Sequence, residues 1–444
     1  MKVLTPPQTS YARLGGLDIA FQVIGDGPPD LIWSAGCFNQ TDEQWEDPAS
    51  GLFMHRVAGF SRLVRFDMLG AGASDRVPSD MRAPTFTEQM DAILDAAQVK
   101  QFASVAIGDA GPGAIEYAAA NPHRVTHLVL FNTTACMRRK TGYPIGVDDE
   151  RLSSFAEVLE RGWGTGATAK IIMPNKTDDD HFLAWFSKCM RSIGTPTEMR
   201  RHVERFTDVD VRHLLGRLRT PTLVLHRKNG LIPESHTRYL ADNIPRAVFV
   251  DLPGSGMSIY HEAPDLVLAH IESFITDSPA PTPGAKSLKA LLFTDIIGST
   301  AHLERLGDRD WSAVLRMHDE ISAIRSAQYG GSVVKSTGDG ILAAFASPVN
   351  AVHAARAMRD DLARMPVGIR SGIHFGEVQE TDHDLIGVAV HIAARVMSQA
   401  KPGEILVSRT LRDLAAGSID DFIDAGTYQL KGIAEPWQLY RVTE

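Results

Sequence analysis

An apolar run that ends in an acid and a glycine turn is the feature that most constrains how this chain can fold. Residues 289–300 read KALLFTDIIGST, with Asp295 after the apolar run and Gly298, Ser299 and Thr300 behind it. This pattern predicts a buried strand that carries a carboxylate at its tip and then turns tightly into a helix. Because backbone N–H groups in such a turn can bind phosphate, the stretch predicts a phosphate-binding edge of a sheet.

A second acid lies in a second turn. Residues 336–340 read STGDG, and apolar runs at 333–334 and 341–345 flank them, which predicts a hairpin with Asp339 at its tip. A lone acid before a turn is usually a turn former. Two carboxylates from two strand tips, Asp295 and Asp339, nevertheless offer the oxygen ligands that hard divalent cations prefer.

The composition is that of ordinary globular proteins. The chain has 444 residues, of which 44% are hydrophobic and 22% charged, so we expect two or three domains. Its net charge of −9 argues against general nucleic-acid binding. No apolar run is long enough to span a bilayer, the N-terminus lacks a signal core, and the scattered cysteines do not predict a disulfide framework. These features predict a cytoplasmic protein that binds neither nucleic acid nor membranes.

A segment rich in proline, alanine and small polar residues divides the chain. It reads DSPAPTPGAK at residues 277–286 and cannot build a core of its own. We therefore expect an N-terminal domain over residues 1–276, a linker over residues 277–287 and a C-terminal domain over residues 288–444.

Short apolar runs alternate with helical patterns in the N-terminal domain, which predicts an α/β layout with a parallel sheet. The expected strands lie at residues 30–33, 63–66, 104–107, 127–131, 222–226 and 247–250, and the clearest helices at 87–97, 113–120 and 234–243. Residues 137–218 lack strand runs and are predicted to form a helical cap over the sheet.

Four phrases of this domain resemble the α/β-hydrolase fold, and the resemblance covers roughly residues 11–275. They are RFDMLGAGASD, AANPHRV, PTLVLH and DLPGSGM, at residues 65–75, 119–125, 221–226 and 251–257. The resemblance implies a nucleophile on a sharp strand-to-helix elbow, an acid and a histidine base.

The nucleophile implied by this resemblance is missing. Gly108 falls at the elbow, and a shifted register gives Asp109 or Ala110 but never a serine or cysteine. An Asp109 nucleophile of the haloalkane dehalogenase type is the sharpest alternative, and it would still need a base and a partner acid.

The implied acid and base are missing as well. The segment after the PTLVLH strand, which includes Asn229 and Gly230, carries no carboxylate, and Met257 stands where the base is expected. His261 lies four residues further on and is expected on the surface. We therefore interpret this domain as a pseudoenzyme that keeps a pocket under its cap, because such a pocket does not depend on the triad.

The C-terminal domain resembles the catalytic domain of class III adenylate and guanylate cyclases. The resemblance rests on FTDI at residues 293–296, GDG at 338–340 and GVAVHIAAR at 387–395, and it runs from about residue 289 to residue 442. The whole chain then resembles hydrolase–cyclase fusion proteins, with an N-terminal α/β-hydrolase fold and a C-terminal α+β cyclase domain. The resemblance implies two Mg²⁺ or Mn²⁺ ions per active site, held by Asp295, Asp339 and the carbonyl group of Ile296.

The same resemblance assigns roles to five further residues. Lys335 and Asp384 match the pair that reads adenine in members that use ATP, and guanine would leave both groups mispaired. Arg395 matches the arginine that acts on the transition-state phosphate, and His391, one helical turn earlier, replaces the usual asparagine at the ribose. Lys431 resembles the phosphate-contacting lysine.

In this family the active site forms between two catalytic domains, one of which supplies the metal acids and the other the arginine. This chain has both sets, so the resemblance implies a homodimer with two equivalent sites. We expect an adenylate cyclase that converts ATP to 3′,5′-cyclic AMP and pyrophosphate, with an unknown small-molecule ligand in the hydrolase-like domain. Two alternatives stay open: a ligand receptor with a weak or silent cyclase half, and a hydrolase that uses Asp109.

Overall fold

The computed structural model describes residues 6–36, 39–78, 80–228, 230–277, 286–364, 367–380, 384–419, 422–433 and 435–443. The chain divides into two compact units, which among the described residues comprise 6–277 and 286–443. The division falls within the predicted linker, of which residues 278–285 lie outside the described residues.

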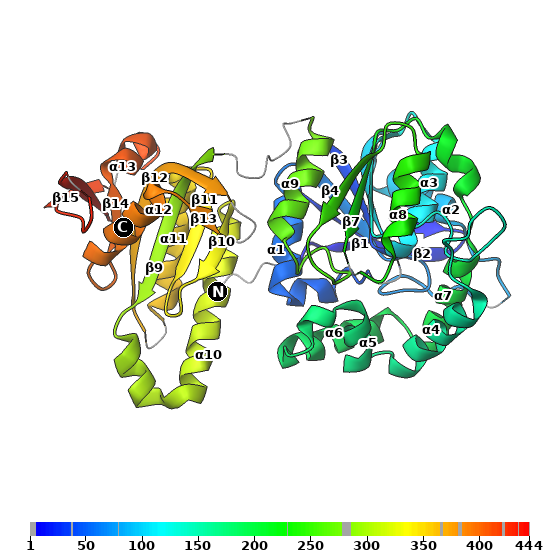
Figure 1. The fold of residues 1–444 in the computed structure, drawn as a ribbon, viewed down its shortest axis with the longest axis horizontal. Helices are drawn as coiled ribbons and strands as arrows, with labels where there is room; N and C mark the ends of the chain where they lie inside the picture. Colours follow the sequence, from blue (N-terminus) through cyan, green and yellow to red (C-terminus); the bar gives the residue numbers. More distant parts are fainter. Residues whose placement is uncertain are drawn as a thin grey trace. The chain divides into compact units, whose positions relative to one another are not determined.

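The first unit is built around a sheet with the strand order β1-β2-β4-β3-β5-β6-β7-β8 (Figure 1). Its strands are β1 (Thr9–Leu14), β2 (Leu17–Ile24), β3 (Asp30–Ser34), β4 (Arg62–Phe66), β5 (Phe102–Ile107), β6 (Val125–Phe131), β7 (Thr222–Arg227) and β8 (Val248–Leu252). Strands β3 to β8 are parallel neighbours and confirm the six predicted runs, whereas the antiparallel pair β1 and β2 was not predicted.

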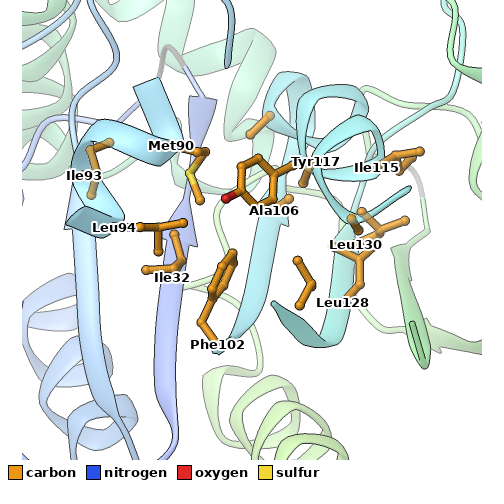
Figure 2. Packing of buried hydrophobic residues seen from close by; sticks show 14 of the residues in the cluster. Ile32, Met90, Ile93, Leu94, Phe102, Ala106, Ile115, Tyr117, Leu128 and Leu130 are labelled. Carbon is orange, nitrogen blue, oxygen red and sulfur yellow. The ribbon is translucent and has the colours of Figure 1, made fainter. Parts of the chain in front are cut away.

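Helices cover both faces of this sheet, as expected for parallel strands that are apolar on both sides. They are α1 (Pro48–Ala58), α2 (Phe86–Ala96), α3 (Gly111–Ala120), α8 (Glu234–Asn243) and α9 (Pro264–Ile275). One apolar cluster joins α2, α3 and α8 to the sheet, and another joins α1 and α9 to it. Figure 2 shows part of the first cluster, in which Met90 and Leu94 of α2 and Tyr117 of α3 lie around Ile32 and Phe102 of the strands.

The predicted cap lies between β6 and β7 and is helical. It contains α4 (Asp149–Gly162), α5 (Gly166–Ile172), α6 (Asp180–Ile193) and α7 (Pro196–Asp208). Its own apolar cluster, which includes Leu159, Met190 and Val203, holds α4, α6 and α7 together. Helix α7 starts with a capping box in which Thr195 and Glu198 satisfy each other's backbone N–H groups.

The second unit has a sheet with the strand order β10-β11-β9-β12-β14-β16-β15, and β13 pairs with β12. The strands are β9 (Lys286–Ile296), β10 (Gly331–Ser336), β11 (Ile341–Phe345), β12 (Ile369–Glu380), β13 (Leu385–Ile386), β14 (Ile405–Ser408), β15 (Phe422–Tyr428) and β16 (Trp437–Val442). The hairpin predicted around Asp339 is present as β10 and β11.

Four helices pack on this second sheet (Figure 1). They are α10 (Ser299–Gln328), α11 (Pro348–Leu362), α12 (Val388–Gln399) and α13 (Arg409–Ala415). Helix α10 bends at Gly307, whose φ of 76° is not helical. Alternate residues of β9 face the α11 cluster and the α12 cluster, so this central strand is buried on both sides. Within the described residues, no helix has both the length and the apolar character needed to cross a membrane.

Candidate functional site

The two acids predicted from the second unit lie on neighbouring segments, one at the end of a strand and one on a turn. Asp295 is near the end of β9, and Asp339 is on the turn between β10 and β11. The backbone N–H of Ile296 donates to the carbonyl oxygen of Asp339 at 2.8 Å. Gly340 explains the close approach, because a Cβ atom at this position would lie 1.9 Å from the carbonyl oxygen of Thr294. The glycine therefore lets one acidic turn pack against the backbone of the other.

Each acid has a partner within the chain. Strand register places Arg370 of β12 opposite Asp295, and the guanidinium nitrogens Nε and Nη2 lie 2.8 Å and 2.5 Å from Oδ2 of the acid. Asp339 accepts a hydrogen bond from Oγ of Ser299 at 2.6 Å. Sequence reasoning missed Arg370, because its position is evident only once two strands far apart in sequence are paired.

The donor set fits a divalent metal. Two carboxylates, Asp295 and Asp339, and the carbonyl group of Ile296 offer oxygen ligands of the kind that Mg²⁺ and Mn²⁺ prefer. The carboxylate of Asp295 is 19% exposed and is paired with the guanidinium of Arg370, so an ion at this acid would compete with an internal cation. Gly298 follows with a left-handed φ of 69° and opens the N-terminus of α10, where backbone N–H groups can meet phosphate.

The two residues predicted to read adenine contact each other. Nζ of Lys335, on β10, lies 2.5 Å from Oδ2 of Asp384, just before β13. Both side chains are partly exposed, at 41% and 38%. The hydrogen bond from Lys335 holds the pKa of Asp384 below its usual value. The pair is thus preassembled on the surface of one unit.

A second group of predicted residues makes no hydrogen bond or ion pair with the two acids in the part of the chain that the structure describes. His391 and Arg395 are exposed on one face of α12, one turn apart, and Lys431 is exposed on the turn after β15. Among the described residues, no hydrogen bond or ion pair joins these three side chains to Asp295 or Asp339. Within the described part of a single chain, therefore, Arg395 does not contact either of the two acids predicted to bind metal.

The candidate elbow of the first unit is a sharp turn between β5 and α3. Gly108 stands at its apex with a left-handed φ of 57°, the conformation that a nucleophile elbow requires, and a short 3₁₀ turn (Gly108–Ala110) leads into α3. This left-handed conformation at Gly108 agrees with the elbow position expected from the sequence.

Asp109 follows the elbow and contacts the cap. Its Oδ2 accepts a hydrogen bond from Nε2 of His202, on α7, at 2.6 Å, and the acid side chain is only 8% exposed. The carboxylate also packs against Gly36, where a Cβ atom would lie 2.0 Å from Oδ1. His202 was not predicted, because a histidine on an amphipathic cap helix gives no sequence signal.

Gly230 and Met257, which stand where the sequence comparison expected an acid and a base, lie near β7 and near the elbow. Gly230 lies in a turn after β7 and donates its N–H to the carbonyl oxygen of Arg227, while Asn229 lies outside the described residues. Met257 reaches the elbow, since its Cε would be 3.8 Å from a Cβ atom on Gly108.

The expectation that His261 lies on the surface was wrong. Its side chain is 5% exposed, with Nε2 3.0 Å from Asp47 and Nδ1 2.7 Å from Oγ of Ser258. Burial acts to raise the pKa of Asp47, but the hydrogen bonds from His261 and Ser50 outweigh it and lower that pKa. Because Asp47 also caps α1, this histidine fastens the loop after β8 to the start of that helix.

A cavity of about 370 Å³ lies beneath the cap, next to the elbow. Aromatic and methionine side chains from α4 and α6 form much of its wall, and Gly108, Asp109 and Met257 form its floor. Its volume is within the range of small-molecule pockets, roughly 300–1,000 Å³.

Another group with metal-ligand chemistry lies on the same unit. Ligand atoms of His226, Glu234 and Asp251 are all within 4.8 Å of one another. Arg238, however, lies 2.6 Å from Glu234 and 3.7 Å from Asp251, so a guanidinium already balances both acids.

Comparisons with known proteins match the two units separately. Residues 60–264 match the family model described as alpha/beta hydrolase fold. The pimeloyl-[acyl-carrier protein] methyl ester esterase of Nitrosomonas europaea is 26% identical over 252 residues, which cover 56% of this chain and 95% of that protein. Putative adenylate cyclase 3 of Rhizobium meliloti is 30% identical over 164 residues, or 35% of this chain, but the chain spans only 28% of its length. The solved adenylyl cyclase CyaB of P. aeruginosa is 26% identical, with 37% of this chain and 97% of that chain covered and a TM-score of 0.35.

The fold and the sequence matches define the class of protein. The chain joins an alpha/beta-hydrolase-fold domain to a C-terminal domain of the class III nucleotide cyclase type. The predicted fold class and the predicted fusion of these two domains are confirmed.

Proposed function

We propose that the protein is an adenylate cyclase that converts ATP to 3′,5′-cyclic AMP and pyrophosphate. The single observation that carries this proposal is the packing of the Asp339 turn against the end of β9, which carries Asp295, beside the N-terminus of α10. That arrangement offers two carboxylates to divalent ions and backbone N–H groups to a triphosphate.

Asp295, Asp339 and the Ile296 carbonyl would hold two Mg²⁺ or Mn²⁺ ions. Bound there, the ions would lower the pKa of the ribose 3′-hydroxyl and neutralise charge on the departing pyrophosphate. The N–H groups of Gly298, Ser299 and Thr300 would orient the phosphates at the start of α10.

Substrate selection would fall to Lys335 and Asp384. Their contact keeps a donor and an acceptor side by side, which complements the N1 and 6-amino groups of adenine. Arg395 would stabilise the transition-state phosphate, His391 would contact the ribose, and Lys431 would contact the phosphates.

We also propose a homodimer, because no hydrogen bond or ion pair joins Arg395 to Asp295 or Asp339 among the described residues of one chain. An exposed apolar patch supports this proposal. Leu288, Ile386 and Val388 are 61%, 57% and 71% exposed on β9, β13 and the start of α12, the helix that carries Arg395. A hollow of about 450 Å³ borders the patch and is lined by Ile386, Val388 and the nearby part of β12. Exposed apolar patches of this kind mark protein contacts.

The direct test is incubation of the purified protein with Mn²⁺ and either ATP or GTP, followed by identification of the products. We expect cyclic AMP from ATP and at least about tenfold less cyclic GMP, because guanine would mispair with Lys335 and Asp384. Absence of any cyclic nucleotide at saturating Mn²⁺ would instead favour the alternative function, a ligand receptor whose cyclase half is silent.

For the N-terminal domain we propose a ligand-sensing or regulatory role without hydrolysis. Gly108 at the elbow apex and Met257 beside it support this role. The contact between Asp109 and His202 favours one competing function, a hydrolase that uses Asp109. A panel of esters and haloalkanes, tested on the intact protein and on Asp109→Asn, separates the two, since turnover that disappears in the variant would establish the hydrolase.

A further inference from the structure

The cavity under the cap is mainly apolar, and methionine side chains form part of its wall. Phe155 of α4, Phe186 and Met190 of α6, and Phe206 of α7 are among its wall residues, and Met173 and Met257 line it near the elbow. Methionine side chains are flexible and polarisable, so they adapt to apolar ligands of different shapes. Against such a wall, the binding free energy of a ligand becomes more favourable as the ligand buries more apolar surface.

The polar side chains at the cavity floor bond to one another. Asp109 lies 2.6 Å from His202. Ser258 lies 2.7 Å from His261, which in turn lies 3.0 Å from Asp47. These carboxyl, imidazole and hydroxyl groups therefore have partners before any ligand enters. A charged ligand would have to break one of these contacts or stay unpaired in an apolar space, and both are costly.

The positive charge of Arg151 at the cavity edge does not provide a partner for a charged ligand inside the cavity. Arg151 lies on the cavity edge, but its side chain is 79% exposed and lies 3.6 Å from Asp148. Tyr260, also on the wall, accepts a hydrogen bond from Trp33 at 3.1 Å.

We propose that this cavity binds an uncharged, mainly apolar small molecule that carries at most one hydroxyl or carbonyl group, directed at Asp109 and His202. The proposal rests on the proposed non-hydrolytic role of this domain. With Gly108 at the elbow, the elbow position itself has no side-chain hydroxyl or thiol to attack a bound ester, and we expect the ligand to stay intact. The contact between Asp109 and His202 joins the elbow to α7, and a ligand seated beside it touches both the sheet and the cap.

The test uses full-length protein and the uncharged dye Nile red as the probe. Decan-1-ol, decanoate and decylammonium share one chain length and differ in charge. We expect saturable Nile red binding, and decan-1-ol should displace the dye at concentrations at least tenfold lower than decanoate or decylammonium at pH 7. Equal potency of the three competitors, or no saturable dye binding, would overturn the proposal.

Two variants locate the site. Met257→Trp should fill the floor and weaken Nile red binding at least tenfold, whereas Met81→Trp, at a 40% exposed position outside the cavity lining, should bind as the wild type does. Asp109→Asn should strengthen decanoate binding at least threefold relative to decan-1-ol, because it removes a negative charge from the cavity floor. Unchanged dye binding in Met257→Trp, or an unchanged ratio in Asp109→Asn, would contradict the assignment.

The same assay separates this proposal from the function proposed above. Methyl decanoate should displace the dye and be recovered intact. If it binds but is cleaved, the ligand class stands and the non-hydrolytic role fails. If it and decan-1-ol fail to bind while ATP is still cyclised, the ligand class fails and the cyclase stands.

Discussion

Arg370 on β12 lies directly opposite Asp295 on β9, and its guanidinium contacts the carboxylate at 2.5 Å. The acid that we propose as a metal ligand is therefore neutralised by the chain itself. A divalent ion that reaches Asp295 meets this positive charge, which opposes binding of the ion unless the arginine moves or gains another anionic partner.

Replacing either proposed metal acid should abolish cyclisation and leave the fold intact. Asp295→Ala and Asp339→Ala remove oxygen ligands at a strand end and at a turn, so we expect a loss of two orders of magnitude or more in rate, about 3 kcal/mol in the barrier. Cyclic AMP production at saturating Mn²⁺, with circular dichroism as the fold control, measures this. Near-normal production by either variant would show that the metal assignment is wrong.

Two inactive variants should restore each other if the site is shared between chains. Asp295→Ala lacks a metal ligand and Arg395→Ala lacks the phosphate-contacting arginine, so a mixed dimer would contain one complete site. We expect cyclic AMP production by the mixture, approaching one quarter of the wild-type rate for random pairing of equal amounts. No recovery, with mixed dimers shown to form, would contradict the shared site.

Removing the guanidinium from Asp295 should strengthen metal binding in the absence of nucleotide. We expect Arg370→Gln to bind Mn²⁺ about tenfold more tightly by titration calorimetry, roughly 1.4 kcal/mol, because a fixed positive charge next to the acid is lost. Arg441→Gln is the matched control, since Arg441 pairs with Glu404 on the same sheet, away from the site. Equal affinity in Arg370→Gln and Arg441→Gln would show that the contact does not limit metal binding.

Acid should destabilise the second unit through His374 of β12. Burial lowers the pKa of this histidine to about 4, while an unfolded chain titrates it near 6.5. Between these values the unfolded state binds the extra proton, so stability falls as the pH falls, by about 2 kcal/mol at pH 5. Urea unfolding at pH 7 and pH 5, monitored by hydrogen exchange of the β12 amides, measures this loss.

The matched variant for this prediction is His374→Gln, which keeps a polar group near Oγ of Ser408, 2.7 Å from the histidine ring. Its unfolding free energy should change less between pH 7 and pH 5 than that of the wild type. An identical pH dependence in the two proteins would show that His374 does not carry the effect.

Much of the fold could be predicted because continuous apolar runs and glycine turns are local signals. Strands β3 to β8, the hairpin around Asp339 and helix α12 all follow from such runs. The antiparallel pair β1 and β2 was missed, since its residues alternate less clearly between apolar and polar. Gly108 at the elbow could be placed from the sequence because only the strand-to-helix junction had to be found.

The contacts that complete the candidate sites could not be predicted in the same way. Arg370 meets Asp295 through strand register, and His202 meets Asp109 through the packing of a cap helix. Both depend on the positions of elements far apart in the chain. The burial of His261 was missed for the same reason, since its partner Asp47 comes from the start of α1.

Strand β12 pairs with β9 along eleven consecutive positions, from Ile369 to Gln379. Side chains alternate along a strand, so one inserted or deleted residue would reverse which of them face the core. In β12, such a change between Arg370 and His374 would separate Arg370 from Asp295 or turn His374 out of its buried position. The length of this segment is therefore constrained both by folding and by the ion pair that neutralises Asp295. We expect related chains to vary there by substitution and not by insertion.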